Sequence, residues 1–241
     1  MRWPARHPVI TGTLALVLVV GSVWVVRLVA LARSVDDAAA YWSKPRGQPG
    51  GLTYVALGDS AAQGIGASRP ANGYVGVLAR RLAAKTGRPV QIINLSRSGA
   101  RIRDVLDTQL PALAALKQKP DLVTVAIGGN DVRAFGPARF AADSAALASA
   151  LPAGTYVADV PYFMHGRWER DADEAARVLT DDVRRAGLRV VPLHQALEDE
   201  GWRAMLTQFA ADWFHPNDRG HRVWANAFWT AMAADPVTEQ P

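Results

Sequence analysis

Short apolar runs alternate with longer amphipathic stretches from residue 52 onward. Five short runs are rich in Val and Ile and apolar on both faces, at residues 53–57, 90–94, 122–127, 155–160 and 188–192. Such runs are typical of strands in a parallel sheet that is covered on both sides. Helical patterns lie at about 73–86, 102–117, 137–150, 170–186 and 217–234. The alternation predicts an α/β fold: a three-layer α/β/α sandwich around a five-stranded parallel sheet.

A different pattern precedes this domain. Residues 9–26 form an uncharged, strongly apolar run that follows Arg2 and Arg6. Eighteen residues just reach the length that crosses the hydrocarbon core of a bilayer as a helix, and Arg27 can reach the interface beyond it. A buried core helix would normally show a polar face, which this run lacks. We therefore expect residues 1–32 to be a transmembrane anchor.

The end of this anchor leaves two alternatives open. Ala30-Leu31-Ala32 fits the small-x-small pattern of a signal-peptidase site, yet the apolar run exceeds the usual hydrophobic region of a signal peptide. We favour an uncleaved anchor with the globular domain outside the cytoplasm; cleavage would instead give a secreted protein. Residues 33–51 are polar with Pro and Gly, which predicts a flexible linker. The globular domain is expected over 52–235, followed by a tail at 236–241.

Charge and composition remove several classes of function. The net charge is +5, but residues 1–50 hold six basic and two acidic residues, a balance of +4, so the other 191 residues carry only +1. A nucleic-acid-binding protein would concentrate its positive charge on the folded domain, so nucleic acid is excluded as a partner. The chain has no cysteine, which excludes disulfides, thiolate metal sites and a cysteine nucleophile.

Candidate chemistry falls where the predicted strands end. In parallel sheets the reactive groups lie on loops beyond the carboxyl ends of the strands. The first predicted strand runs into Gly58-Asp59-Ser60 and the third into Gly128-Gly129-Asn130-Asp131. Taken alone, Ser60 fits a helix N-cap better than a nucleophile. The segment Gly128-Gly129-Asn130-Asp131, taken alone, is an ordinary turn.

Two further segments carry the same kind of signal. Gly99 follows the second predicted strand and can bring its backbone N–H close to a ligand, although it could equally just turn the chain. Asp212 and His215 can lie side by side in one loop before the last helix, where the carboxylate would fix the tautomer of the imidazole. The pair could also be a helix cap or half of a metal site, but no further ligand spacing accompanies it, so we expect no metal.

Together the four segments resemble the SGNH (GDSL-like) hydrolases, a family named for a Ser, a Gly, an Asn and a His in four separated blocks. The matches occur in the order of the family and span about residues 53–234. The resemblance implies a flavodoxin-like sandwich that hydrolyses carboxylic esters or related acyl bonds without a cofactor. By matching positions, Ser60 would be the nucleophile, His215 the general base and Asp212 its orienting acid. The backbone N–H groups of Ser60 and Gly99 and the side chain of Asn130 would form the oxyanion hole.

The substrate stays open between small-molecule esters, lipid esters, acyl thioesters and acetylated glycans. An acyltransferase, in which an acceptor hydroxyl replaces water, is an alternative on the same scaffold. A non-catalytic flavodoxin-like binding module is another, but it would not need Asp212 and His215. The sequence does not indicate an oligomeric state.

Other side chains are expected around the cleft. Asp59 and Asp131 flank candidate catalytic positions and are interpreted as turn-fixing residues. Two histidines and five large apolar residues follow predicted strands or lie near the site, where they could line the cleft or simply pack: His165, His194, Phe135, Phe163, Met164, Trp168 and Trp213.

Overall fold

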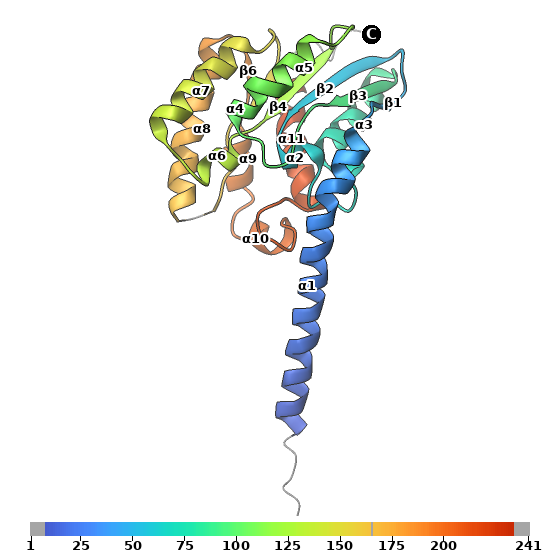
Figure 1. The fold of residues 1–241 in the computed structure, drawn as a ribbon, viewed down its shortest axis with the longest axis vertical. Helices are drawn as coiled ribbons and strands as arrows, with labels where there is room; N and C mark the ends of the chain where they lie inside the picture. The colour runs from blue at the N-terminus through green and yellow to red at the C-terminus, as the bar shows by residue number, and fades with distance from the viewer. Residues whose placement is uncertain (1–7, 165, 234–241) are drawn as a thin grey trace, which may run out of the picture.

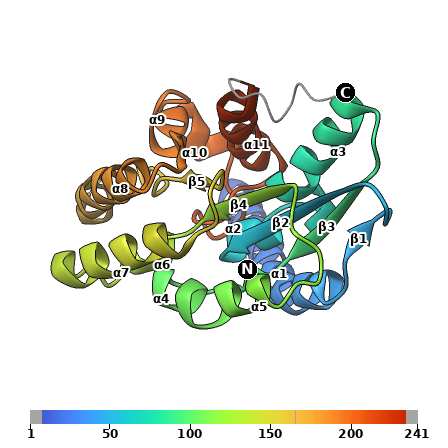
Figure 2. The same ribbon diagram turned by 90° about the horizontal axis from the view of Figure 1, so that it is seen from above.

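The computed structural model describes residues 8–164 and 166–233. A six-stranded sheet lies between two layers of helices (Figure 1, Figure 2). The strands are β1 (Arg46–Gly47), β2 (Leu52–Gly58), β3 (Val90–Asn94), β4 (Leu122–Ala126), β5 (Tyr156–Ala158) and β6 (Arg189–Val191).

Helices connect the strands and extend the chain at its N-terminal side. The long helices are α1 (Pro8–Trp42), α3 (Tyr74–Thr86), α7 (Pro137–Ala150), α8 (Arg167–Arg185) and α11 (Asp218–Ala233). The short ones are α2 (Ser60–Gln63), α4 (Ile102–Asp104), α5 (Leu110–Ala114), α6 (Gly129–Val132), α9 (Leu193–Glu198) and α10 (Arg203–Thr207), with a 3₁₀ turn η1 (Pro70–Asn72) and a π-helical turn η2 (Val105–Gln109).

The strand order fixes where a ligand site can form. The sheet runs β1-β3-β2-β4-β5-β6, and all pairs except β1–β3 are parallel. Counted along the chain, the parallel strands have the order 2-1-3-4-5 of flavodoxin-type sheets. The order reverses between β2 and β4, and ligands bind beyond the carboxyl ends of the strands at such a point. The segments that begin at Asp59 and Ile127 leave the sheet at this point.

The prediction of a five-stranded, purely parallel sheet is wrong in one respect. Arg46 and Gly47 add a sixth strand, antiparallel to β3, so the sheet is mixed. The guanidinium of Arg46 donates to the carbonyl of Tyr41 at 2.6 Å and lies over the Tyr41 ring. These contacts fasten a two-residue strand that carries no apolar alternation of its own.

Alternation along β2 divides the core into two halves. Tyr54 and Ala56 face a cluster formed with α1, α2, α3 and α11, whereas Val55 and Leu57 face a cluster formed with α4, α7 and α8. Both faces of the strand are fully buried, as the doubly apolar pattern predicts. Figure 2 shows α3 and α11 on one side of the sheet and α4 and α7 on the other.

Residues 33–42 are helical rather than part of a flexible linker. Helix α1 continues to Trp42, and Leu31, Val35, Ala38 and Trp42 pack against the domain at helical spacing. The indole N–H of Trp42 also donates to the carbonyl of Gln63 at 2.9 Å. Within Val17–Trp42 of the same helix a window has a mean hydropathy of 1.8, with none of it buried, which is the length and composition of a membrane span. Figure 1 shows α1 projecting well beyond the domain.

The predicted helix at 102–117 is also broken into pieces. The π-helical turn η2 lies between α4 and α5, and it directs Gln109 toward the sheet. Short helices α9 and α10 were not predicted because each offers too few turns for a periodic pattern. The expected tail at 236–241 lies outside the described residues.

His221 of α11 ties the last helix to the loop around Ile65. Its ring is fully buried; Nδ1 accepts from the Tyr74 N–H at 3.3 Å, and Nε2 is 3.0 Å from the Ile65 carbonyl oxygen. This pairing requires a neutral imidazole with its proton on Nε2. Burial lowers the pKa of His221 to about 4, below the usual value of 6.5.

This histidine is expected to make the stability of the domain depend on pH. Below pH 6.5 the unfolded chain binds a proton that the folded chain takes up only near pH 4, so stability is complete above pH 6.5 and falls toward pH 4. The His221→Gln variant cannot titrate, and its loss of stability between these values should be smaller by about 3 kcal/mol. Urea unfolding followed by Trp fluorescence measures both proteins; identical slopes against pH would contradict the expectation.

Candidate active site

Ser60 stands where β2 turns into α2. Gly58 has φ of +142°, and a Cβ there would approach the Ala126 carbonyl oxygen to 2.2 Å, so the end of β2 requires glycine. Asp59 caps α2 by accepting the Ala61 N–H at 3.0 Å. Ser60 is the first residue of that helix, so its own N–H has no acceptor within the helix.

Gln109 holds the peptide groups on both sides of Gly58. Its side chain accepts from the Gly58 N–H and donates to the Gly58 carbonyl, both at 2.8 Å. Both residues are buried. The buried amide therefore fixes the strand end two residues before Ser60. No local sequence signal pointed to Gln109, because the π-helical turn that directs it was not predictable from spacing.

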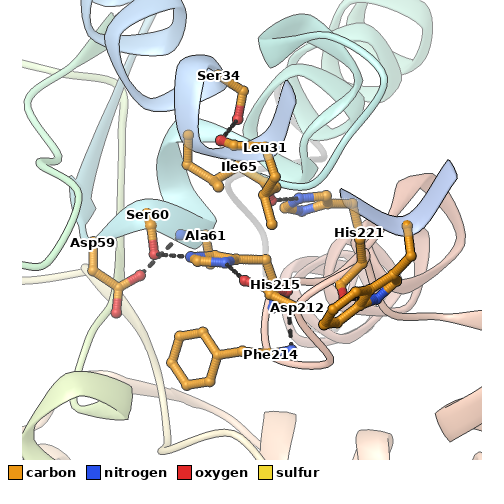
Figure 3. A network of polar contacts seen from close by, with 12 residues as sticks. Leu31, Ser34, Asp59, Ser60, Ala61, Ile65, Asp212, Phe214, His215 and His221 are labelled. Carbon is orange, nitrogen blue, oxygen red and sulfur yellow. Dashed lines mark hydrogen bonds and ion pairs between the residues drawn. The ribbon is translucent and has the colours of Figure 1, made fainter. Parts of the chain in front are cut away.

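A chain of hydrogen bonds joins three of the predicted site residues. His215 Nε2 is 2.9 Å from Ser60 Oγ, and His215 Nδ1 is 2.6 Å from Asp212 Oδ2 (Figure 3). The other Asp212 oxygen accepts the backbone N–H groups of Phe214 and His215, each at 3.1 Å. Burial alone would raise the pKa of Asp212, but these hydrogen bonds and the nearby imidazole hold it below its usual value. The carboxylate thus stays ionised beside the ring.

The loop that carries Asp212 and His215 is fixed by its own backbone. Ala210 donates to the His215 carbonyl at 2.8 Å, and Asn217 donates to the Gln208 carbonyl at 2.8 Å. Trp213 at the tip has φ of +57°, a left-handed conformation that few non-glycine residues adopt. The backbone of this loop therefore brings a carboxylate and an imidazole three residues apart into contact.

Asn130 lies beside these groups but does not contact Ser60 directly. Its amide nitrogen donates to the Ala100 carbonyl at 3.0 Å and to Asp59 Oδ2 at 3.3 Å. The first contact places the side chain next to the loop of Gly99, which has φ of +79° and open space where a Cβ would stand. The structure thus brings the four predicted segments to one end of the sheet, with Gly99 and Asn130 held through Ala100.

Gln63 fixes the loop before Gly99. Its side-chain oxygen accepts the N–H and the hydroxyl of Ser98, at 3.0 and 2.6 Å, and its nitrogen donates to the Ser96 carbonyl at 3.1 Å. Gln63 is buried and belongs to the same short helix as Ser60. One helix therefore positions both the serine and the loop of Gly99.

Asp59 fixes its own turn, as predicted, whereas Asp131 joins two segments that are distant in the sequence. Asp131 accepts the N–H of Ile102 at 3.2 Å, which ties the loop after β4 to α4. Burial raises the pKa of Asp59 to about 6, although the Ala61 N–H and the nearby His215 favour its ionised form. Burial likewise raises the pKa of Asp131 to about 6, against the effect of the Ile102 N–H.

A cavity of about 560 Å³ opens beside Ser60 and His215. Its walls come from the loop after β5, the start of α8, α10 and the 209–216 segment. They are rich in large apolar side chains: Phe163, Met164, Trp168, Met205, Phe209, Trp213, Phe214 and Trp224. The space next to the serine can therefore hold an apolar group. Gly99 and Asn130 lie outside the lining of this cavity.

The loop that forms one wall is held by a partly buried contact between Glu169 and His194. Glu169 binds the Phe163 N–H at 2.6 Å and His194 Nε2 at 3.1 Å, while His194 Nδ1 lies 3.0 Å from the Val160 carbonyl oxygen. Burial raises the pKa of Glu169, although the Phe163 N–H and His194 favour its charged form. His194, a possible cleft residue from the sequence, thus supports the wall rather than lining it. Sequence reasoning missed Glu169, which lies far from His194 along the chain.

Of the other residues predicted to lie near the cleft, some line the cavity and others do not. Phe163, Met164, Trp168 and Trp213 line the cavity. Phe135 instead packs against Phe140 at a ring-centroid distance of 5.5 Å. The predicted cleft residue His165 lies outside the described residues.

Comparison with known proteins adds to this geometry. The model described as the GDSL-like Lipase/Acylhydrolase family matches residues 56–223. The chain is 29% identical over 199 residues to the GDSL-like esterase Rv1075c of Mycobacterium tuberculosis, a match that covers 76% of the chain and 62% of the relative. It is 35% identical over 102 residues to esterase TesA of Pseudomonas aeruginosa, covering 42% of the chain and 49% of the relative. The matches thus span less than two thirds of either curated relative.

A solved structure supports the same likeness. The crystal structure described as TesA superposes on this chain with a TM-score of 0.64 at 27% identity. The superposition covers 77% of this chain and 99% of that one.

Proposed function

Because the chain belongs to the GDSL-like lipase/acylhydrolase family, we propose that it is a serine hydrolase that cleaves carboxylic esters through an acyl-enzyme intermediate. The observation that carries the proposal is the hydrogen-bonded series Ser60–His215–Asp212 at the wall of a cavity. Both curated relatives are named esterases, which supports the ester as substrate. A binding module would have no use for this series.

In the first half-reaction Ser60 attacks the acyl carbon of the ester. A free serine hydroxyl is a poor nucleophile, and His215 Nε2, at 2.9 Å, takes its proton as the new C–O bond forms. Asp212 holds the ring in the tautomer that accepts at Nε2 and stabilises the imidazolium that results. His215 then gives the proton to the leaving alcohol, which departs as the ester C–O bond breaks.

The carbonyl oxygen carries negative charge between these two events. We assign its stabilisation to the backbone N–H groups of Ser60 and Gly99 and to the Asn130 amide. Asn130 has one short contact, to Ala100, and one longer contact, to Asp59 at 3.3 Å. The N–H directed at Asp59 is the one that can turn to the oxyanion.

Water completes the cycle. It attacks the acyl group on Ser60 while His215 again acts as base, which releases the carboxylic acid and restores the serine. No step in this sequence needs a metal or an organic cofactor. An alcohol in place of water would make the same site an acyltransferase.

We also propose that α1 is an uncleaved membrane anchor, with the hydrolase domain outside the cytoplasm. Its segment Val17–Trp42 contains an exposed apolar window with the length and composition of a span. Cleavage after Ala32 would cut α1 ten residues before its end and remove Leu31 from its packing against the domain. The helix therefore supports an intact chain better than a signal peptide.

Hydrolysis of p-nitrophenyl esters of graded acyl length tests the proposed activity. We expect the purified chain to release p-nitrophenol from these esters. Esters with longer acyl chains should also be substrates, because the cavity beside Ser60 is apolar. Ser60→Ala should be inactive, whereas Ser149→Ala, on the exposed side of α7, should match the wild type. Activity of the Ser60→Ala variant at the wild-type level would overturn the proposal, and product esters formed on adding alcohols would reveal acyl transfer.

A further inference from the structure

The exposed large apolar side chains of the described residues fall into two groups. One group is the surface of α1 from Val17 to Val29. The other contains four residues, which we name the apolar rim: Trp168, Trp202, Leu206 and Trp213, with exposed fractions of 49%, 68%, 68% and 57%. Large apolar surfaces left in water mark an interaction site.

The apolar rim lies at and next to the entrance of the cavity beside Ser60. Trp168 and Trp213 line the cavity and are exposed, so they stand at its mouth. Trp202 is the residue before α10, and Leu206 lies on α10 next to Met205, which also lines the cavity. Figure 1 shows α10 beside the point where α1 leaves the domain.

A hydrogen bond joins the apolar rim to the membrane helix. The indole N–H of Trp24 donates to the Ala211 carbonyl at 3.0 Å, two residues before Trp213. Trp24 lies in the last turn of the apolar run 9–26, just before Arg27. Tryptophan is the residue typical of the boundary between hydrocarbon and headgroups. The loop that carries Asp212 and His215 is therefore held at the level where the apolar run ends.

The length of the apolar run 9–26 agrees with a membrane boundary at Trp24. Eighteen residues at 1.5 Å per residue extend about 27 Å, close to the thickness of a hydrocarbon core of about 30 Å. The part of α1 that packs on the domain starts only at Leu31, beyond Arg27. A bilayer that holds the run thus reaches up to the face of the domain that carries the apolar rim.

Positive side chains accompany the apolar rim. Arg203 is exposed, and its guanidinium lies 5.7 Å from the Trp202 ring centroid. Arg27 is exposed on α1 directly after the run. Arginines beside tryptophans suit the phosphates of lipid headgroups, whereas the tryptophan rings suit the acyl boundary.

We propose that the apolar rim docks on the lipid bilayer that holds α1, so that the cavity opens onto the membrane surface and takes its acyl ester from there. The inference rests on the proposed anchor and on the proposed esterase site, whose substrate class it narrows to membrane-partitioned esters. A second copy of the chain is the less favoured occupant, because the Trp24–Ala211 hydrogen bond places the apolar run of α1 against this face.

Fluorescence quenching tests the docking in the full chain. The chain has no cysteine, so single variants Trp202→Cys, Leu206→Cys and Lys119→Cys can each carry one environment-sensitive fluorophore. Lys119 is exposed in the turn before β4, at the opposite ends of the strands. In vesicles of phosphatidylcholine and phosphatidylglycerol with a nitroxide on the upper acyl chain, labels at 202 and 206 should be quenched severalfold more than the label at 119. Equal quenching at all three positions would overturn the proposal.

Kinetics test the consequence for substrate uptake. The double variant Trp202→Glu/Leu206→Glu should keep the wild-type kcat/KM on soluble p-nitrophenyl acetate but lose roughly tenfold or more on a long-chain p-nitrophenyl ester held in the same vesicles. Ala114→Glu/Gln118→Glu adds the same charge at the far end of the domain and should change neither rate. Equal rates of the rim variant and this control on the vesicle-held ester would contradict the proposal.

The two arms separate the possible failures. If the wild type hydrolyses neither ester, the proposed function fails, while the quenching experiment still decides whether the apolar rim meets lipid. The labels at 202 and 206 could instead be quenched no more than the label at 119, while the chain forms a stoichiometric dimer through this face. In that case a second copy occupies the face and the docking proposal is wrong.

Discussion

Replacement of His215 by Ala is expected to lower kcat/KM for an ester by roughly 10⁴–10⁶-fold. The imidazole is the group within hydrogen-bonding reach of the Ser60 hydroxyl at 2.9 Å that can take its proton. Without it, the hydroxyl must attack at its ordinary acidity, and the leaving alcohol receives no proton. Initial rates on p-nitrophenyl acetate measure the loss.

Added imidazole provides the control for this variant. The side chain of His215 is about one fifth exposed, so a free imidazole molecule can enter the space that the ring leaves. The rate of His215→Ala should therefore rise with imidazole concentration, while that of Ser60→Ala should stay at background. A loss of less than tenfold, in a variant that unfolds at the wild-type urea concentration, would contradict the role of His215.

Replacement of Asn130 by Ala should lower kcat by about 10²–10³-fold with little change in KM. Loss of one preorganised donor to an oxyanion typically has this effect, because the donor acts on charge that exists only in the transition state. Saturation kinetics on a soluble p-nitrophenyl ester separate the two constants.

A surface asparagine offers the matched control. Asn72 is partly exposed in η1, donates to the Ser68 hydroxyl and does not line the cavity beside Ser60. Asn72→Ala should keep the wild-type kcat. If Asn130→Ala lowers stability and leaves kcat intact in the folded fraction, Asn130 only fixes the loop through Ala100, and its place in the oxyanion hole is wrong.

The sequence was informative wherever the chemistry follows a strand end. Ser60 and Asn130 could be located because the strands at 53–57 and 122–127 were apolar on both faces, and parallel strands end at one edge of the sheet. Asp212 and His215 are three residues apart, so their contact needed no knowledge of the fold. The hydrogen bonds that link Ser60 to His215, 155 residues away, could be only inferred until the loops were placed.

Residues whose contacts depend on long-range packing could not be predicted from the sequence. Glu169 and His194 meet only because β5 and β6 are neighbours in the sheet, and Gln109 reaches Gly58 only through a π-helical turn. Each lies in a helical stretch, where polar side chains are usually solvated.

The continuation of α1 beyond residue 33 was missed for a different reason. The Pro and Gly residues at 45–51 drew the whole segment into a predicted linker. The apolar positions 31, 35, 38 and 42 already had helical spacing, and they pack on the domain. This packed continuation sets the direction in which the apolar part of α1 leaves the domain.

Labelling with a fluorophosphonate tests the central claim most directly, since the probe reacts with a serine only when it is activated as a nucleophile. Intact-mass and peptide analysis of the full chain should show one adduct per molecule of wild type, on the peptide that contains Ser60. Ser60→Ala and His215→Ala should show none under the same conditions. A folded wild type that takes up no probe, or one whose adduct persists after Ser60→Ala, would contradict the assignment of Ser60 as the nucleophile.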